Sequence, residues 1–236
     1  MESETDDSLA RRVHQILDRI RCAAARAGRS PETVRLVAAT KTVPAERIRE
    51  GLGAGLILLG ENRMQEALAK VALLRDLSPR WHFIGQLQRR KVRDAIGTFE
   101  LIHSVDSVEL AQEINRRAGD AGVKQAVLLE VNIAGEASKA GFQPDALMQD
   151  LAILGGLPHL RIQGLMTIPP PTAQPEDARP YFRALRELGA RIVAEERPSL
   201  VMQEFSMGMS HDFEIAIEEG ATLVRVGTAI FGARHV

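Results

Sequence analysis

The sequence has 236 residues, of which 45% are hydrophobic and 26% charged, a composition typical of a globular protein with one large domain or two small ones. Its 30 basic and 31 acidic residues leave a net charge of −1, which argues against a general affinity for nucleic acid or anionic membranes. Cys22 is the single cysteine, which excludes a disulfide framework and a cysteine-based zinc site.

The first residues, MESETDDSLARR, are acidic and lack the apolar segment of a signal peptide. No apolar run approaches the roughly 20 residues that a membrane span needs. We therefore expect a cytoplasmic protein that contacts neither membrane nor nucleic acid.

Apolar residues at helical spacing predict a helix over 8–27, which Gly28 ends. Short apolar runs then alternate with amphipathic stretches, and these runs are 35–41, 56–62, 81–87, 101–107, 126–132, 161–168, 201–208 and 222–232. Near-continuous apolar strands separated by helices are typical of a parallel sheet that is covered on its outside. Eight such units favour an α/β fold closed into a (β/α)8 TIM-type barrel over an open doubly wound sheet.

We expect a single domain over 1–236, with a helix at 8–27 and eight strand–helix units over 35–232. Little sequence follows the eighth apolar run, too little for a full eighth helix. The extra N-terminal helix is expected to cover that flank of the barrel instead.

Functional groups in such a barrel lie at the carboxyl ends of the strands, and Lys41 ends the first apolar run. The chain has only five lysines against twenty-five arginines, so a lysine at this position is informative. By two-residue alternation Lys41 shares the inward face with Val37 and Ala39. Desolvation lowers the pKa of an amine, which makes it a nucleophile for carbonyl compounds. The alternative is a lysine whose stem packs on the strand while its amine reaches water.

A second candidate site would bind an anion. Ser210 precedes a helix-like stretch, and Gly227 and Thr228 follow the apolar core of the eighth run. Barrels often bind phosphate with the loops after strands seven and eight and with the free N–H groups of a helix start. The alternative is that Ser210 only caps the helix that follows it.

Arg225 lies two residues before Gly227 and shares its face, so it points into the barrel. A buried guanidinium requires an acceptor, and a pyridine nitrogen would serve, as in some pyridoxal enzymes. An internal salt bridge is the alternative.

These residues lie in segments that resemble one known family. The segments are LVAATKTV (36–43), GENRMQE (60–66), WHFIGQLQRRK (81–91), HSVDS (103–107), GLMTI (164–168) and FSMGMSHDFEIAIEEGATLVRVGTAIFG (205–232). In this order they resemble the pyridoxal phosphate homeostasis proteins, which are small relatives of the N-terminal barrel of alanine racemase and of eukaryotic-type ornithine decarboxylase. The likeness spans almost the whole chain.

The resemblance implies that the chain binds pyridoxal 5′-phosphate (PLP). The residues implied to contact the cofactor are Lys41, Asn62, His82, Ser210, Arg225, Gly227 and Thr228. Lys41 would form the Schiff base, and Arg225 would meet the pyridine nitrogen. Asn62 and His82 would line the ring or its 3-hydroxyl side, and the remaining three would hold the phosphate.

The expected function is that of a PLP carrier or buffer, with client PLP-dependent apoenzymes as partners. An arginine at the ring nitrogen keeps that nitrogen unprotonated, which weakens the ring as an electron sink. In alanine racemases the second base comes from a C-terminal domain of the partner subunit, and no such domain follows this barrel. A weak racemase or a decarboxylase of unknown substrate is the alternative, and a monomer is the expected state.

The basic run Arg89, Arg90, Lys91 and Arg93 is the one local excess of charge. A solvated helix face is the simplest interpretation, and an anion- or cofactor-docking surface near the barrel mouth is the alternative. Members of the family commonly have asparagine where Arg90 stands, which leaves the role of that position open. A nucleic-acid or protein adaptor would rest on this run alone. The histidines show no metal-ligand spacing, so no metal site is expected.

Overall fold

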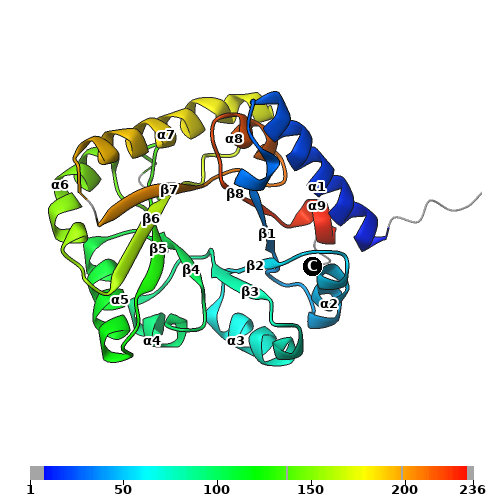
Figure 1. Ribbon diagram of the computed structural model, residues 1–236, viewed down its shortest axis with the longest axis horizontal. Helices are drawn as coiled ribbons and strands as arrows, with labels where there is room; N and C mark the ends of the chain where they lie inside the picture. Colours follow the sequence, from blue (N-terminus) through cyan, green and yellow to red (C-terminus); the bar gives the residue numbers. More distant parts are fainter. Residues whose placement is uncertain (1–7, 137, 198, 233–236) are drawn as a thin grey trace, which may run out of the picture.

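The computed structural model describes residues 8–136, 138–197 and 199–232. Within these residues eight parallel strands close into one barrel in chain order, and helices surround it (Figure 1). The strands are β1 (Arg35–Ala39), β2 (Leu58–Glu61), β3 (Arg80–Phe83), β4 (Leu101–Val105), β5 (Gln125–Glu130), β6 (Leu160–Met166), β7 (Leu200–Ser206) and β8 (Leu223–Val226). The predicted barrel is therefore confirmed.

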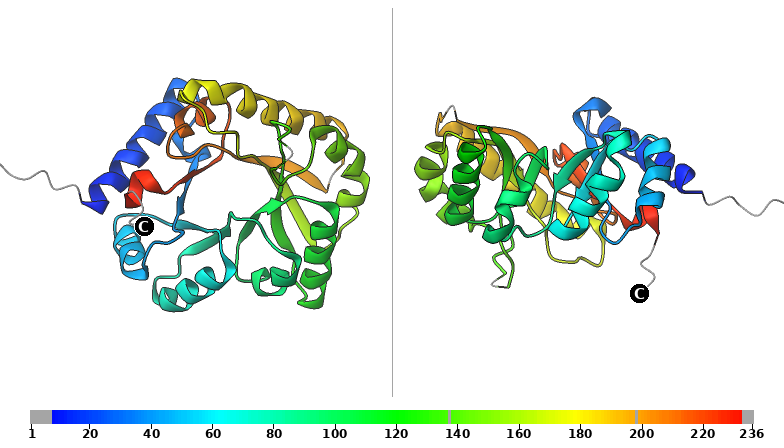
Figure 2. Two further views of the ribbon diagram at one scale, coloured as in Figure 1. Left: turned by 180° about the vertical axis from the view of Figure 1, so that it is seen from behind. Right: turned by 90° about the horizontal axis from the view of Figure 1, so that it is seen from below.

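The helices that follow the strands are α2 (Ala45–Gly53), α3 (Met64–Leu73), α4 (Val92–Ala95), α5 (Val108–Asp120), α6 (Pro144–Gly155), α7 (Arg179–Ala194), α8 (Phe213–Glu218) and α9 (Thr228–Phe231). Helix α1 (Leu9–Arg26) precedes them all. Figure 2 shows that the loops after β5 and β6 project from the same edge of the barrel. None of the helices among the described residues combines the length and the apolar character that crossing a membrane would need.

Alternation along the strands divides the core into two parts. Side chains that point outward pack under the helices, as Ala38, Leu59 and Ile102 do. Side chains that point inward fill the barrel and form a smaller cluster of Val37, Leu58, Leu101, Ala126, Leu128, Met166 and Leu223. The register that pairs Val37 of β1 with Arg225 of β8 closes the barrel.

The last predicted strand, 222–232, is wrong beyond Val226. Strand β8 ends there, and the apolar residues that follow form the short helix α9. A Cβ atom at Gly227 would lie 3.0 Å from the carbonyl oxygen of Ala39, so the chain turns away from β1 at a residue without a side chain. Ile230 is therefore buried as a residue of helix α9 and not as a residue of a strand.

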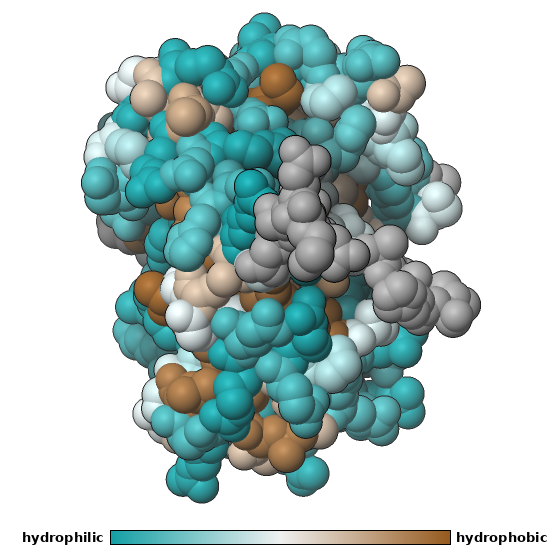
Figure 3. Space-filling view, turned by 90° about the vertical axis from the view of Figure 1, so that its right-hand side faces the viewer, coloured by the Kyte–Doolittle hydropathy of each residue, from teal (hydrophilic) through white to brown (hydrophobic). Residues whose placement is uncertain are grey.

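Helix α1 covers the flank beside the eighth strand, as expected. It packs against α8 and α9, and Arg12 donates from Nε to the carbonyl oxygen of Ile230 at 2.7 Å. The face seen from this side is mostly hydrophilic, with small separate apolar groups (Figure 3). An amphipathic helix buried on one side thus covers this flank together with the short helices α8 and α9.

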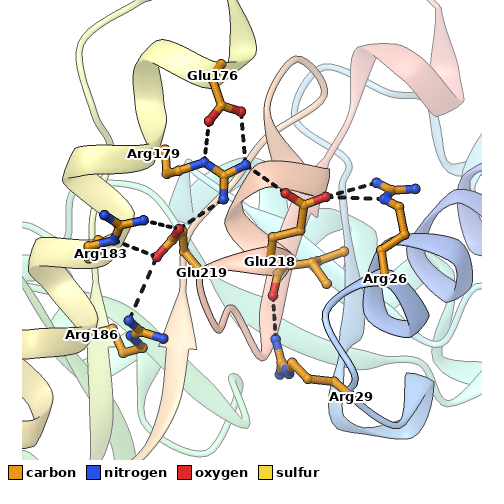
Figure 4. Close-up of polar contacts among 9 residues, drawn as sticks. Arg26, Arg29, Glu176, Arg179, Arg183, Arg186, Glu218 and Glu219 are labelled. Carbon is orange, nitrogen blue, oxygen red and sulfur yellow. Dashed lines mark hydrogen bonds and ion pairs between the residues drawn. The ribbon is translucent and has the colours of Figure 1, made fainter.

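A network of charged side chains joins α1, α7 and α8 (Figure 4). Glu218 pairs with Arg26 of α1 at 3.2 Å and with Arg179 of α7 at 2.7 Å. Glu219 follows it, is only 6% exposed at its side chain, and pairs with Arg179 at 2.9 Å and Arg183 at 3.0 Å. The network therefore fixes both flanking helices to the turn that precedes β8.

Candidate functional site

Lys41 lies two residues after the end of β1, at the start of the turn that leads to α2. It lines a cavity of about 560 Å³ together with Ala39, Thr42, Val43, Pro44, Arg47, Gly227, Thr228, Phe231 and Gly232. Three of the sequence-predicted residues, Lys41, Gly227 and Thr228, therefore share one cavity at the carboxyl ends of β1 and β8.

A buried ionic cluster holds the backbone on both sides of Lys41. Before it, Thr40 donates to Glu61 at 2.6 Å, and the ammonium of Lys70 donates to the Thr40 carbonyl oxygen at 2.6 Å and to Glu61 at 2.7 Å. After it, the N–H of Thr42 donates to Glu66 at 2.6 Å, and Lys70 reaches the same carboxylate at 2.5 Å. Lys70 thus binds both Glu61 and Glu66, the two carboxylates that are hydrogen-bonded to the residues on either side of Lys41.

The turn needs such support because Thr42 has a φ of 63°, a conformation that costs a residue with a side chain about 1 kcal/mol or more. Glu61 is fully buried. Burial raises the pKa of Glu61, and the hydrogen bonds from Lys70 and Thr40 oppose that rise. This cluster could not be foreseen from the sequence, although Glu61 and Glu66 belong to the segment 60–66.

The three residues expected to hold an anion meet next to Lys41. The N–H groups of Gly227 and Ala229 both point to the hydroxyl oxygen of Ser210, each at 3.4 Å. Helix α8 begins at Phe213 with Asp212 as its N-cap residue, and Asp212 accepts from the N–H of Met209 at 2.7 Å. The alternative interpretation, in which Ser210 is the N-cap residue of α8, is therefore wrong. The hydrogen-bond partners of the Ser210 hydroxyl are instead the N–H groups that follow β8.

Arg225 lies inside the barrel and is 5% exposed. Its guanidinium donates to the hydroxyl of Ser206 at 2.6 Å and to the carbonyl oxygen of Thr167 at 2.9 Å. Among the described residues no carboxylate lies within ion-pair distance of Arg225, so the internal salt bridge does not form there. Burial lowers the pKa of Arg225 to about 10, while Glu130 and Asp212 oppose the fall. It remains a cation at neutral pH.

A chain of hydrogen bonds runs from Arg225 across the barrel. Ser206 contacts Nδ1 of His103 at 2.8 Å, and Nε2 of His103 contacts Nδ1 of His82 at 2.9 Å. Burial lowers the pKa of His82 to about 4 and that of His103 well below its usual value, so both rings are neutral.

Only the first bond of this chain has a fixed direction: a guanidinium can only donate, so Ser206 accepts from Arg225. The hydroxyl of Ser206 has a second lone pair as well as a proton, so the bonds of His103 and His82 run in the direction that their tautomers set. Nε2 of His82 is buried and has no partner among the described residues. The place of His103 in this chain could not be inferred from the sequence, because the partners come from four strands that meet only when the barrel closes.

Glu130 and Asp212 are the acids that act on Arg225, at the start of this chain. Burial raises the pKa of Glu130 to about 7, the Asp106 carboxylate adds to the rise, and Arg225 opposes it. Glu130 ends β5 and lines a cavity with Asn132 and Lys139. A group that titrates near neutrality therefore lies inside the barrel mouth.

Asn62 and His82 do not line the cavity that contains Lys41. Asn62 follows β2, and the loop after β3 approaches it closely at Gly85. A Cβ atom at Gly85 would lie 2.3 Å from the Asn62 carbonyl oxygen, so this approach requires glycine. His82 lies deeper, within the barrel, and is 1% exposed. Arg47 and Phe231 line the cavity without having been expected there.

Comparison with known proteins agrees with this architecture. A family model described as the alanine racemase N-terminal domain matches residues 12–235. An alanine racemase of Clostridium difficile, 18% identical with a TM-score of 0.70, shares the fold over 95% of this chain and 56% of its own. The closed barrel and the match to this family model thus place the protein in the alanine racemase N-terminal-domain class.

Relatives of higher sequence identity identify the family within this class. The chain is 49% identical to the pyridoxal phosphate homeostasis protein of Aquifex aeolicus, over 94% of this chain and 97% of the relative. It is 45% identical to that of Pseudomonas aeruginosa, over 96% of both chains. PipY of Synechococcus elongatus, solved with PLP bound, is 41% identical with a TM-score of 0.81, over 92% of this chain and 100% of its own. The chain belongs to the family of pyridoxal phosphate homeostasis proteins.

Proposed function

We propose that this protein binds PLP at the mouth of its barrel, as a Schiff base on Lys41, and serves as an intracellular carrier or buffer of that cofactor. The observation that carries the proposal is that Lys41, Gly227 and Thr228 line a single cavity of about 560 Å³. The names of the relatives and the PLP bound to PipY support the choice of cofactor.

The phosphate end of the cofactor fits the corner beside Ser210. The N–H groups of Gly227 and Ala229 converge there with a hydroxyl, which is the donor set that a phosphate accepts from. A side chain at position 227 would meet Ala39, so only glycine leaves this corner open. We assign Ser210, Gly227 and Thr228 to the phosphate.

The ring end fits the interior of the barrel. Arg225 lies two residues before Gly227 and presents a buried cation, fixed by Ser206 and Thr167, that can donate to a ring nitrogen. The proposal assigns Asn62 and His82 to the ring side as well. The bound cofactor supplies an aldehyde that forms a reversible bond with an amine.

The composition of the cavity favours a carrier over an enzyme. Racemisation needs a proton donor and an acceptor on opposite faces of the substrate. Among the described residues that line the cavity, Lys41 and Arg47 are the titratable ones, and no carboxylate, imidazole, phenol or thiol joins them. Arg225, which stays protonated at neutral pH, also keeps a facing ring nitrogen unprotonated. We place this carrier in the cytoplasm, with PLP-dependent apoenzymes as its clients.

Visible absorption spectra with added PLP test the binding site. The wild type and Lys124→Ala, which alters an exposed lysine far from the cavity, should both develop the band of a Schiff base. Lys41→Ala should not develop it. Reduction with borohydride should fix the label on the peptide that contains Lys41. A band that survives in Lys41→Ala would show that the assignment of Lys41 is wrong.

Turnover assays test the carrier role separately. The loaded protein should activate a PLP-dependent apoenzyme and should not convert amino acids at an enzyme-like rate. Turnover near about 10 per second, a typical enzyme value, would contradict the carrier role and leave the binding site standing.

A further inference from the structure

A second cavity, which we call the β2–β3 cavity, opens at the carboxyl ends of β2 and β3. It measures about 330 Å³ and is lined by Asn62, Arg63, Met64, Gln65, Phe83, Gln86, Leu87, Gln88, Arg90 and Lys91. None of these residues lines the cavity of Lys41. The β2–β3 cavity is therefore separate from the cavity of Lys41, and it shares only Asn62 with the residues assigned to the cofactor.

The lining of the β2–β3 cavity is cationic. Arg63, Arg90 and Lys91 contribute three positive charges, and no aspartate or glutamate is among the lining residues. Within the described parts of the chain these three cations form no ion pair. Arg90 is instead oriented by a hydrogen bond from its Nε to the side-chain oxygen of Gln88 at 3.0 Å. The lining of the cavity thus carries positive charge with no acid of its own, while Glu66 lies near Arg63 and Arg90 also lines the cavity of Glu109 and Glu113.

The neighbouring cations of the same run behave differently. The Arg93 side chain is 80% exposed and lies 3.9 Å from Asp94. Arg89 lines another cavity that also contains Glu109 and Glu113. Solvation or nearby acids account for these two arginines and also for Arg63 and Arg90, which are exposed. They do not account for Lys91, which is partly buried.

Neutral donors complete the β2–β3 cavity. Its lining includes four carboxamides, those of Asn62, Gln65, Gln86 and Gln88. Helix α3 also begins at this cavity, because Arg63 is its N-cap residue and makes no capping hydrogen bond. The N–H groups of Met64 and Gln65, in the first turn of that ten-residue helix, add to the same donor set.

We propose that the β2–β3 cavity is a second binding site, for phosphate or the phosphate group of a small organic ester. Guanidinium and ammonium groups combined with amide donors are the usual partners of phosphate oxygens. The volume is at the low end for small-molecule sites, which fits a small ligand. The site also gives a role to the segments 60–66 and 81–91, both of which reach this cavity.

Inorganic phosphate and glycerol 3-phosphate are the probes, with glycerol as the control for the organic part. Titrations followed by ¹H–¹⁵N NMR at a salt concentration of about 0.15 M, which screens distant charges, separate the two sites, because amides 85–91 report on the β2–β3 cavity and amides 227–229 on the proposed cofactor corner. The variants are Lys91→Gln and Arg63→Gln. The matched controls, Arg93→Gln and Arg89→Gln, remove the same charge from the same surface.

Saturable shifts at amides 85–91 are expected with both phosphate probes and not with glycerol. Lys91→Gln and Arg63→Gln should each weaken this binding by about tenfold, the effect of one charged hydrogen bond. The two controls should change it less than about threefold, as expected for charges more than a few ångströms from the ligand in salt. Lys41→Ala should leave it unchanged.

Tighter binding of glycerol 3-phosphate would identify an ester as the ligand, and equal binding would identify phosphate itself. Absence of shifts at 85–91, or equal losses in the variants and the controls, would overturn the proposal. Because the readout does not depend on PLP, this result is independent of the Lys41 assignment.

Discussion

Lys70 is the residue on which the geometry around Lys41 depends most. It is 6% exposed and is the shared partner of Glu61 and Glu66. Those two carboxylates in turn hold Thr40 and Thr42, the neighbours of Lys41. A residue that never touches the cavity thereby positions the amine that lines it.

Replacing Lys70 with methionine keeps the aliphatic stem and removes the charge. Glu61 is then buried without its cation, a loss that costs about 3–5 kcal/mol. We expect the free energy of unfolding in urea to fall by this order and the affinity for PLP to fall with it. Lys124→Met, at an exposed lysine, should stay within about 0.5 kcal/mol of the wild type. A Lys70→Met protein as stable as that control would show that the cluster does not support the turn.

His82 makes the stability of the barrel depend on pH. Its pKa falls from 6.5 to about 4 because burial disfavours the charged ring. The unfolded chain therefore binds more protons than the native state between these two values, so stability rises with pH across this window. Above about pH 6.5 the contribution is complete, and it is lost as pH falls toward 4. The shift corresponds to about 3 kcal/mol.

Urea unfolding measured from pH 4 to pH 7 tests this dependence. Each buried histidine contributes up to about one proton to the slope with which stability falls on acidification, and Glu130, whose pKa is raised to about 7, opposes it by up to about one proton over the same range. His82→Gln should remove about one proton from that slope, whereas His14→Gln, at an exposed histidine of α1, should not. Equal slopes in the two variants would contradict a neutral, buried His82.

At the scale of elements, patterns with a period of two or 3.6 residues predicted the strands and helices correctly, because burial imposes those periods directly. They also placed Lys41 at the mouth of the barrel and Arg225 inside it. The run 222–232 failed because an apolar stretch of that length packs equally well as a strand followed by a helical turn. Partners across the barrel, such as His103 with Ser206, depend on closure and register, which local periodicity does not contain.

The turn between α8 and β8 depends on two adjacent glutamates that bind neighbouring helices. Glu219 and Glu176 both pair with Arg179, but their side chains are 6% and 62% exposed. Because they share a partner and differ in exposure, substitutions at these two positions compare the contribution of a buried and of an exposed glutamate to stability. The pairs of Glu219 also involve exposed arginines, so solvent screens part of their strength.

Glu219→Gln should lower the free energy of unfolding by about 1–3 kcal/mol, because the partly exposed arginines around it lose a buried counter-charge. Glu176→Gln should change it by less than about 0.5 kcal/mol, as is usual for an exposed ion pair. Chemical denaturation of both variants beside the wild type measures the difference. If the two substitutions cost the same, the network in Figure 4 is a solvated surface rather than a clamp.

At the scale of the whole molecule, the described surface argues for a monomer. The most exposed large apolar side chains lie before β2, at the end of α3 and just after it, on α6 and on α7, and they are Ile57, Leu73, Leu77, Ile153 and Val193. A stable homodimer usually buries about 800 Å² on each partner, with an apolar centre.

Light scattering during size exclusion should therefore give the mass of one chain at micromolar concentration, with and without PLP. A dimer mass in both samples would show that scattered apolar contacts suffice for association. A dimer that forms only with PLP would instead show that the mouth of the barrel takes part in the interface, and a carrier would then have to dissociate before it delivers its cofactor.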